Sequence, residues 1–268
     1  MAYEVLVLDI DGTLTTTEKK ISEDTFKAIR NIQKRGHKIV LASGRPTPGI
    51  WPVAKELNMR TYGGFILSFN GAKIIDCSTN KVIYQKTLPH ELLPEIYEAA
   101  LYYKTGLVTY DEDKILVATK VDEFVKKEAW INKLPFVEIP DFLNHVNFPI
   151  NKCLMTGEPE YLAEVELKMK ERFAGRLNIF RSEPCFLEIV SLGIDKAKAL
   201  GNLLDYLHLS REQMITCGDG YNDITMIQYA GMGVAMANAQ QKVKEVADYI
   251  TLSNDNNGIA HVINEFML

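Results

Sequence analysis

The hydrophobic and polar positions at the start of the chain predict strands that alternate with helices. The short apolar run from Glu4 to Leu8 ends in polar residues, which is typical of a buried strand. Apolar residues then recur at helical spacing from about Ser22 to Arg35, where Ser22 is a favourable N-cap and Gly36 a stop signal. The next elements are strands at Lys38 to Ala42 and Phe65 to Phe69, with a helix containing Val53 to Leu57 between them. This order predicts βαβ units and a parallel sheet.

The pattern changes after the third strand. Two apolar runs flank Ser78-Thr79-Asn80 and predict a hairpin, at Lys73 to Asp76 and Val82 to Gln85. Beyond it we expect helices at Glu91 to Lys104, Asp122 to Lys133 and Glu160 to Phe173. Strands of mixed character are expected at Leu107 to Tyr110, Ile115 to Thr119, Lys152 to Thr156, Asn178 to Arg181 and Phe186 to Val190. The three prolines between Pro135 and Pro149 predict a loop with interrupted strands.

The regular alternation of helices and strands resumes near Lys196. Helices are expected at Lys196 to Leu207, Asp223 to Ala230, Gln240 to Ala247 and from about Gly258 onward. The strands between them are expected at Gln213 to Cys217, Gly233 to Ala235 and Tyr249 to Leu252. We therefore predict an α/β protein with a doubly wound, Rossmann-like, mostly parallel core sheet. Residues 1–82 and 189–268 would form this core, and residues 83–188 an inserted α/β domain.

Composition and charge narrow the class of protein. The chain has 268 residues, of which 47% are hydrophobic and 24% charged, as in a soluble globular protein. Its formal net charge of -5 argues against a nucleic-acid partner, because such proteins need a basic face. No apolar run is long enough to span a membrane, no secretory signal is expected, and the four cysteines lack metal-site or disulfide spacing. We expect a cytoplasmic protein without a membrane partner, and its oligomeric state stays open.

Four polar clusters stand directly after predicted strands. They are Asp9-Ile10-Asp11-Gly12-Thr13, Ser43-Gly44-Arg45, Asn70-Gly71 and Gly218-Asp219-Gly220-Tyr221-Asn222-Asp223. Ligands of open parallel sheets bind outside the carboxyl ends of the strands. If these strands are parallel neighbours, all four clusters meet at one edge of the sheet. This convergence predicts the functional site more strongly than any single cluster does.

The two carboxylates of Asp9 and Asp11 have two simpler explanations. A calcium-binding EF-hand loop starting at Asp9 would need Gly and Glu where the chain has Leu14 and Lys20, so it is rejected. A solvated turn is compatible with the residue types. However, a turn requires no second pair of carboxylates elsewhere in the chain, and Asp219 and Asp223 form such a pair.

The motifs resemble those of a known enzyme superfamily. Asp9-Ile10-Asp11-Gly12-Thr13 is similar to the D-x-D-G-T signature of haloacid dehalogenase (HAD) superfamily phosphatases, and Gly218 to Asp223 is similar to their G-D-x-x-N-D motif. The order of all motifs resembles that of Cof-like sugar phosphatases, in which the insertion is a C2-type cap. The chain departs from the family pattern at Ala197, where Gly is usual after the lysine, and at Ala237 within Met236-Ala237-Asn238-Ala239. Neither change removes an ionisable group.

The resemblance implies roles for the acidic residues. Asp9 suits a covalent nucleophile that forms an aspartyl phosphate, and Asp11 suits the general acid and base. The carboxylates and a phosphate share one site only if a cation is present, and Mg²⁺ prefers such oxygen ligands. The implied Mg²⁺ ligands are the carboxylates of Asp9 and Asp219 and the backbone carbonyl of Asp11. Asp223 would hold Lys196 or a metal-bound water from behind these ligands.

The remaining motif residues have alternatives that the sequence leaves open. Ser43 and Lys196 are expected to bind the phosphoryl oxygens, although Lys196 read alone resembles an ordinary surface helix lysine. Arg45, next to Gly44, either reaches the substrate or forms a structural salt bridge. Further substrate-binding candidates are Gly44, Asn70, Gly71 and Asn222, with a simple turn as the alternative for Asn70 and Gly71.

The favoured function is a Mg²⁺-dependent phosphatase of small phosphorylated metabolites, with sugar phosphates as the expected class. Residues 83–188 would select the substrate and exclude water, with hinges near Asn80 to Val82 and Ser191 to Gly193. One alternative is a phosphomutase of the phosphomannomutase type, which would keep the phosphate on the sugar. Another is a catalytically silent sugar-phosphate-binding protein, which the complete set of motif residues disfavours.

Overall fold

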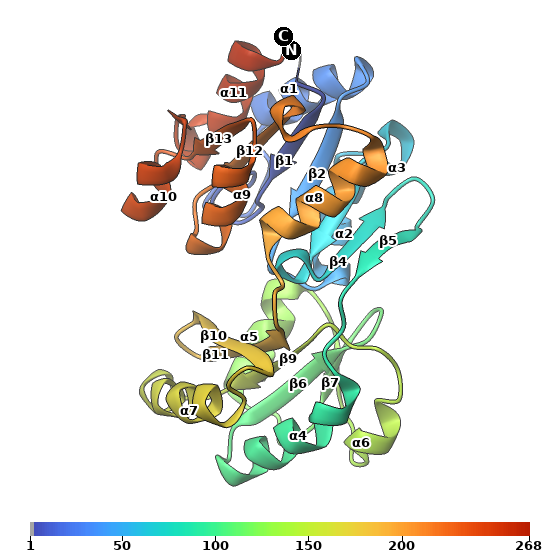
Figure 1. The fold of residues 1–268 in the computed structure, drawn as a ribbon, viewed down its shortest axis with the longest axis vertical. Helices are drawn as coiled ribbons and strands as arrows, with labels where there is room; N and C mark the ends of the chain where they lie inside the picture. The colour runs from blue at the N-terminus through green and yellow to red at the C-terminus, as the bar shows by residue number, and fades with distance from the viewer. Residues whose placement is uncertain (1–2) are drawn as a thin grey trace. The chain divides into compact units, whose positions relative to one another are not determined.

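Both ends of the chain contribute strands to a single sheet. The computed structural model describes residues 3–268, and its larger sheet has eight strands in the order β14-β13-β12-β1-β2-β3-β4-β5 (Figure 1). The strands are β1 (Val5–Leu8), β2 (Lys38–Ala42), β3 (Phe65–Ser68), β4 (Lys73–Asp76), β5 (Val82–Gln85), β12 (Met214–Gly218), β13 (Met232–Ala235) and β14 (Tyr249–Ile250). The strands from β14 to β3 pair in parallel, and β4 and β5 add an antiparallel hairpin.

Strand β1 lies at the point where the strand order reverses. It pairs with β2 on one side and β12 on the other, so that Val5 faces both Lys38 and Met214. All of its residues are buried, which explains its continuous apolar run. A reversal of strand order opens a crevice at the carboxyl ends of the strands. The mixed α/β architecture and the mostly parallel sheet confirm the predicted fold class.

The helices of this first unit follow the predicted capping signals. Helix α1 (Glu23–Lys34) begins after Ser22, whose hydroxyl accepts a hydrogen bond of 3.3 Å from the Thr25 backbone N–H. The other helices of this unit are α2 (Thr47–Glu56), α3 (Met59–Tyr62), α8 (Lys196–Leu207), α9 (Ile224–Tyr229), α10 (Gln241–Val246) and α11 (Gly258–Phe266). Helices α8 and α9 contact each other on the near side of the sheet in Figure 1, and α1 contacts α11.

The middle of the chain forms a second unit with its own sheet. Its six strands have the order β10-β11-β9-β6-β7-β8. Their bounds are β6 (Gly106–Tyr110), β7 (Ile115–Val117), β8 (Phe136–Glu138), β9 (Lys152–Thr156), β10 (Leu177–Glu183) and β11 (Phe186–Ser191). The helices of this unit are α4 (Leu93–Tyr102), α5 (Glu123–Asn132), α6 (Phe142–His145) and α7 (Pro159–Arg172). Buried apolar residues of α4, α7 and the sheet form a separate core.

The boundaries of the two units fall a few residues from the expected ones. Unit 1 comprises the residues up to 85 and from 195 onward, and unit 2 comprises residues 86–194. The whole of β5 pairs with β4 and so lies in unit 1, whereas β11 extends to Ser191 in unit 2. The expected loop with interrupted strands from Pro135 to Pro149 contains the short strand β8, and it also contains a short helix, α6, whose Phe142 is buried in the core. Among residues 3–268, no helix has the length and apolar character required to cross a bilayer.

Candidate active site

The four polar clusters follow four adjacent parallel strands. Asp9 follows β1, Ser43 follows β2, Phe69 to Gly71 follow β3, and Asp219 follows β12. These strands are neighbours in the order β12-β1-β2-β3, so their carboxyl ends lie side by side. The predicted convergence at one sheet edge is therefore present in unit 1.

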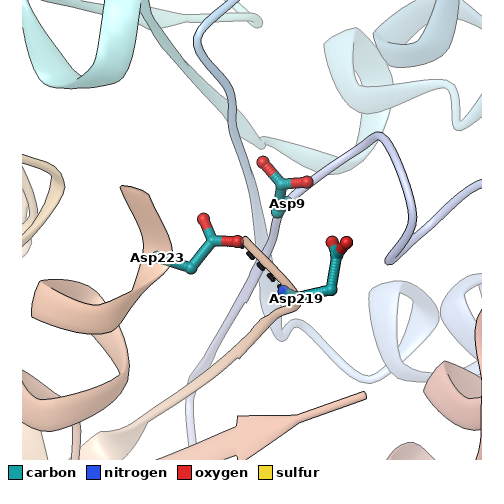
Figure 2. Close-up of side chains that lie close together, drawn as sticks. All are labelled: Asp9, Asp219 and Asp223. Atoms are coloured by element: carbon teal, nitrogen blue, oxygen red, sulfur yellow. Dashed lines mark hydrogen bonds between the residues drawn. The ribbon is translucent and has the colours of Figure 1, made fainter. Parts of the chain in front are cut away.

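Three carboxylates meet at this edge. Asp9, Asp219 and Asp223 each offer an oxygen within 4.8 Å of the others, and Figure 2 shows their side chains close together around the end of β1. Asp9 is only 6% exposed. Its burial raises its pKa well above the ordinary value, the charges of Asp223 and Asp219 add to this rise, and Lys196 opposes it. Burial likewise raises the pKa of Asp219 to about 6.

Lys196 supplies the cation of this cluster. It is the first residue of α8, and its Nζ donates to Asp9 at 2.9 Å, to Asp223 at 2.6 Å and to the Ala42 carbonyl at 2.9 Å. Its side chain is fully buried, so it is not an ordinary surface helix lysine. Burial would lower its pKa, but the negative charges of Asp223 and Asp9 outweigh this effect and raise it. The ammonium group therefore stays charged in the core of unit 1.

Asp223 positions its neighbours with both of its oxygens. Oδ1 accepts from Lys196, while Oδ2 accepts from the backbone N–H groups of Asp219 at 3.0 Å and Gly220 at 2.9 Å. The first of these backbone bonds is the dashed line in Figure 2. Asp223 thus holds both Lys196 and the turn that carries Asp219, and its place behind the metal ligands stays a prediction.

The donor set fits a hard divalent cation. Asp9 Oδ1 accepts from Lys196 and Asp219 Oδ1 accepts from Thr13, whereas no described residue forms a hydrogen bond with the second oxygen of either carboxylate. Burial is the main cause of the raised pKa of both groups, and the charges of neighbouring carboxylates add to the rise. Carboxylate oxygens are the ligands that Mg²⁺ prefers. Asp9 and Asp219 are therefore suitable ligands for this ion.

Asp11 is held by two cations. The Arg45 guanidinium donates to both of its oxygens, at 2.7 and 2.6 Å, and Lys19 Nζ donates to Oδ1 at 2.8 Å. Burial raises the pKa of Asp11, but the hydrogen bonds and charges of Arg45 and Lys19 outweigh burial and lower it. Of the two alternatives for Arg45, the structure contains the salt bridge, and its contact with substrate stays a prediction. Lys19 was not expected from the sequence.

Gly12 and Thr13 join the loop after β1 to Asp219. Gly12 has a φ of +84°, and a Cβ there would overlap the Asp219 carboxylate. The Thr13 hydroxyl donates to Asp219 Oδ1 at 2.7 Å and so orients a proposed metal ligand. The role of Thr13 was missed, although its place in the first motif was a signal for it.

The other substrate-binding candidates follow the strands β2, β3 and β12. The Asn222 side chain donates to Asn70 Oδ1 at 3.0 Å, and a Cβ at Gly44 would lie 3.1 Å from Asn70 Nδ2. The Ser43 hydroxyl is buried and accepts from the Arg45 backbone N–H at 3.2 Å. Gly71 packs against α8, because a Cβ there would lie 2.7 Å from the Asp195 carbonyl. For Gly71 the structure provides a packing reason; the substrate contacts of this group stay predictions.

Comparisons with known proteins identify the family of this chain. Residues 6–263 match the family model described as haloacid dehalogenase-like hydrolase. The chain is 31% identical to 5-amino-6-(5-phospho-D-ribitylamino)uracil phosphatase YcsE of Bacillus subtilis, covering 99% of this chain and 96% of that protein. A haloacid dehalogenase-like hydrolase from Bacteroides thetaiotaomicron has a similar structure, with a TM-score of 0.95, 48% identity and 98% of both chains covered.

A further solved structure connects the fold to a described activity. The HAD subclass IIB sugar phosphatase BT4131 matches with a TM-score of 0.81 and 28% identity over 98% of each chain. This relative and YcsE are both named phosphatases, in agreement with the predicted enzyme class. The match to the family model covers nearly the whole chain and confirms the resemblance predicted from the motifs. The chain belongs to the haloacid dehalogenase-like hydrolase family.

Proposed function

We propose that the chain is a Mg²⁺-dependent phosphatase that hydrolyses small phosphate monoesters of the sugar-phosphate class through an aspartyl phosphate on Asp9. The observation that carries this proposal is the buried contact of Lys196 with Asp9 beside Asp219, at the carboxyl end of β1. The names of YcsE and BT4131 support small phosphorylated substrates.

The chemistry assigned to the chain's own residues has two steps. In the first, a carboxylate oxygen of Asp9 attacks phosphorus, the bond to the leaving oxygen breaks, and Asp11 in its protonated form gives that oxygen a proton. Because the contact with Arg45 lowers the pKa of Asp11, we propose that this contact loosens when substrate binds. In the second, Asp11 takes a proton from water while the water oxygen attacks phosphorus and the bond to Asp9 breaks. Lys196, whose Nζ lies 2.9 Å from Asp9 Oδ1, is proposed to stabilise the negative charge of the phosphoryl oxygens.

The Mg²⁺ ion is proposed to be held by the carboxylates of Asp9 and Asp219 and the backbone carbonyl of Asp11. When bound, it would offset the charge of the carboxylates and of the phosphate. Thr13 and Asp223 would keep Asp219 in place, since they hold its side chain and its backbone.

Release of inorganic phosphate from a panel of phosphorylated metabolites is the first test. We expect turnover with Mg²⁺, loss of turnover in excess chelator, and recovery when Mg²⁺ is returned. Asp219→Asn should raise the Mg²⁺ concentration needed for half-maximal activity by about 10- to 100-fold, because it removes a charged ligand. Asp205→Asn, at an exposed position of α8, is the matched control and should leave the requirement unchanged.

Two results would contradict this proposal. Full activity in excess chelator would exclude a requirement for Mg²⁺ in turnover. Transfer of the phosphate to another position of the same sugar, without release, would instead establish a phosphomutase. Measurement of free phosphate and of phosphorylated products in one reaction separates these outcomes.

Substrate choice is proposed to lie in unit 2, the expected C2-type cap. All residues with a proposed chemical role belong to unit 1, although unit 2 comprises residues 86–194. Substitutions in unit 2 should therefore alter the ranking of substrates without altering the chemistry.

A chimera tests this division of labour. Exchanging residues 86–194 for the corresponding unit of a relative with different preferences should transfer that relative's order of kcat/KM among substrates. The Mg²⁺ requirement should stay that of the parent, because its proposed ligands are unchanged. A folded, active chimera that keeps the parent's substrate ranking would disprove the proposal for unit 2.

A further inference from the structure

The loop that follows Asp11 is tied to the C-terminal part of the chain. Its residues 12–17 are contacted by Asn238, which follows β13, and by Asn254 and Asp255, which follow β14. We call these three residues the C-terminal clasp. Each contact joins residues more than 220 positions apart, since their separations are 226, 239 and 238.

Two asparagines of the clasp are joined by a hydrogen bond. The Asn238 side chain donates to the Gly12 carbonyl at 2.8 Å, and its Oδ1 accepts from the Asn254 backbone N–H at 3.0 Å. The Asn254 side chain then donates to the Thr15 carbonyl at 3.0 Å. Because both functional groups of Asn238 are used, its orientation is fixed from two sides.

Asp255 holds the outer part of the same loop. One of its oxygens accepts from the Thr17 backbone N–H at 2.8 Å and the other from the Thr17 hydroxyl at 2.7 Å. These two bonds hold the pKa of Asp255 below its ordinary value. Thr17 and Asp255 are both exposed, so the pair is not needed to satisfy buried groups.

Both ends of this loop lie at Asp11, which is proposed to act first as the acid and then as the base. Gly12 follows Asp11 directly, and Lys19, two residues after Thr17, returns to donate to Asp11 Oδ1 at 2.8 Å. The loop thus begins next to Asp11, and its last residue, Lys19, contacts the Asp11 carboxylate. The three clasp residues fix the backbone between these two points.

We propose that Asn238, Asn254 and Asp255 are positioning residues that hold Asp11 for proton transfer through the loop of residues 12–19. The inference rests on the proposed function, in which Asp11 protonates the leaving oxygen and later deprotonates water. Proton transfer requires hydrogen-bond reach, and small displacements of a catalytic group are costly. The clasp assigns a role to the Met236-Ala237-Asn238-Ala239 motif.

The test compares two substrates that differ in their need for a proton. With a sugar phosphate, Asn238→Ala and Asp255→Ala should each lower kcat by about 10- to 100-fold. The KM should change by less than about threefold, because the loop is not proposed to bind the substrate. With p-nitrophenyl phosphate, the first release of p-nitrophenolate in a rapid-mixing experiment should keep its rate, because this leaving group needs no proton. Later turnover should slow, because hydrolysis of the aspartyl phosphate uses Asp11 as a base.

Conservative and control variants separate positioning from a general loss of structure. Asp255→Asn keeps one acceptor for Thr17 and should recover part of kcat. Asn256→Ala removes a hydrogen bond of 2.8 Å to Ser253 within the segment after β14 that carries Asn254 and Asp255. This variant should behave as wild type. An unchanged kcat in both alanine variants would overturn the inference, and so would an equal loss in the burst and steady-state phases. Failure of the wild type to release phosphate would instead overturn the proposed function.

Discussion

Asp9→Asn is expected to abolish turnover while the protein stays folded. The amide has the shape of the carboxylate but cannot attack phosphorus, so kcat should fall by at least ~10⁴-fold. Burial and the charges of Asp223 and Asp219 raise the pKa of Asp9, so ionising it at neutral pH costs folding free energy. The neutral Asn avoids this cost. In chelator, the free energy of unfolding of the variant should therefore equal or exceed that of the wild type.

Three measurements check this expectation. They are steady-state phosphate release, chemical unfolding in chelator, and trapping of the wild type with beryllium fluoride as a phosphoryl mimic. Asp205→Asn is again the matched control, since it makes the same chemical change at an exposed site. Substantial turnover by Asp9→Asn would exclude covalent catalysis at this residue. A marked loss of stability would contradict the electrostatic argument.

Lys196→Met is expected to reduce both activity and stability. Loss of the ammonium beside Asp9 should lower kcat/KM by about 10²- to 10³-fold, the usual effect of removing one well-placed electrostatic donor. The same change leaves the buried carboxylate of Asp223 without its cation, which costs about 3–5 kcal/mol of unfolding free energy. Lys196→Arg should rescue poorly, because a planar guanidinium does not fit the three acceptors of a fully buried ammonium.

A second substitution separates the two effects. Asp223→Asn in the Lys196→Met background removes the uncompensated charge and should restore part of the stability but none of the activity. Lys198→Met, at an exposed position on the same helix, is the matched control. Urea unfolding and kcat/KM are measured for each variant. Nearly wild-type turnover of Lys196→Met would remove Lys196 from the proposed mechanism.

The sequence predicted the position of the site because strand ends are local features. Buried parallel strands are short apolar runs, and polar residues after them, such as Asp9 and Asp219, lie at their carboxyl ends. Helix starts were predictable for the same reason, as the Ser22 cap of α1 illustrates. These features depend on neighbouring residues, and the sheet then aligns them.

The partners of the site residues depend on contacts between distant segments. Sequence spacing gave no means of deciding whether Arg45 binds substrate or Asp11, because that choice depends on how two separate loops approach each other. The burial of Lys196 was not predictable for the same reason. A lone helix lysine is usually exposed, and the acceptors that retain this one in the core, Asp9, Asp223 and the Ala42 carbonyl, come from distant segments. The contact of Thr13 with Asp219 spans 206 residues and was missed.

The central place of β1 in the sheet has a consequence for synthesis of the protein. Strand β1 pairs with β12 from Val5–Met214 to Leu8–Cys217, so one of its edges has no native partner until the last quarter of the chain is made. At ordinary translation rates this interval is about 10–40 s. Residues 86–194 are complete earlier and contain a whole sheet of their own. The nascent chain therefore carries one finished unit while an apolar strand edge of the other still awaits its partner, and Asp9 meets Lys196 and Asp219 only near the end of translation.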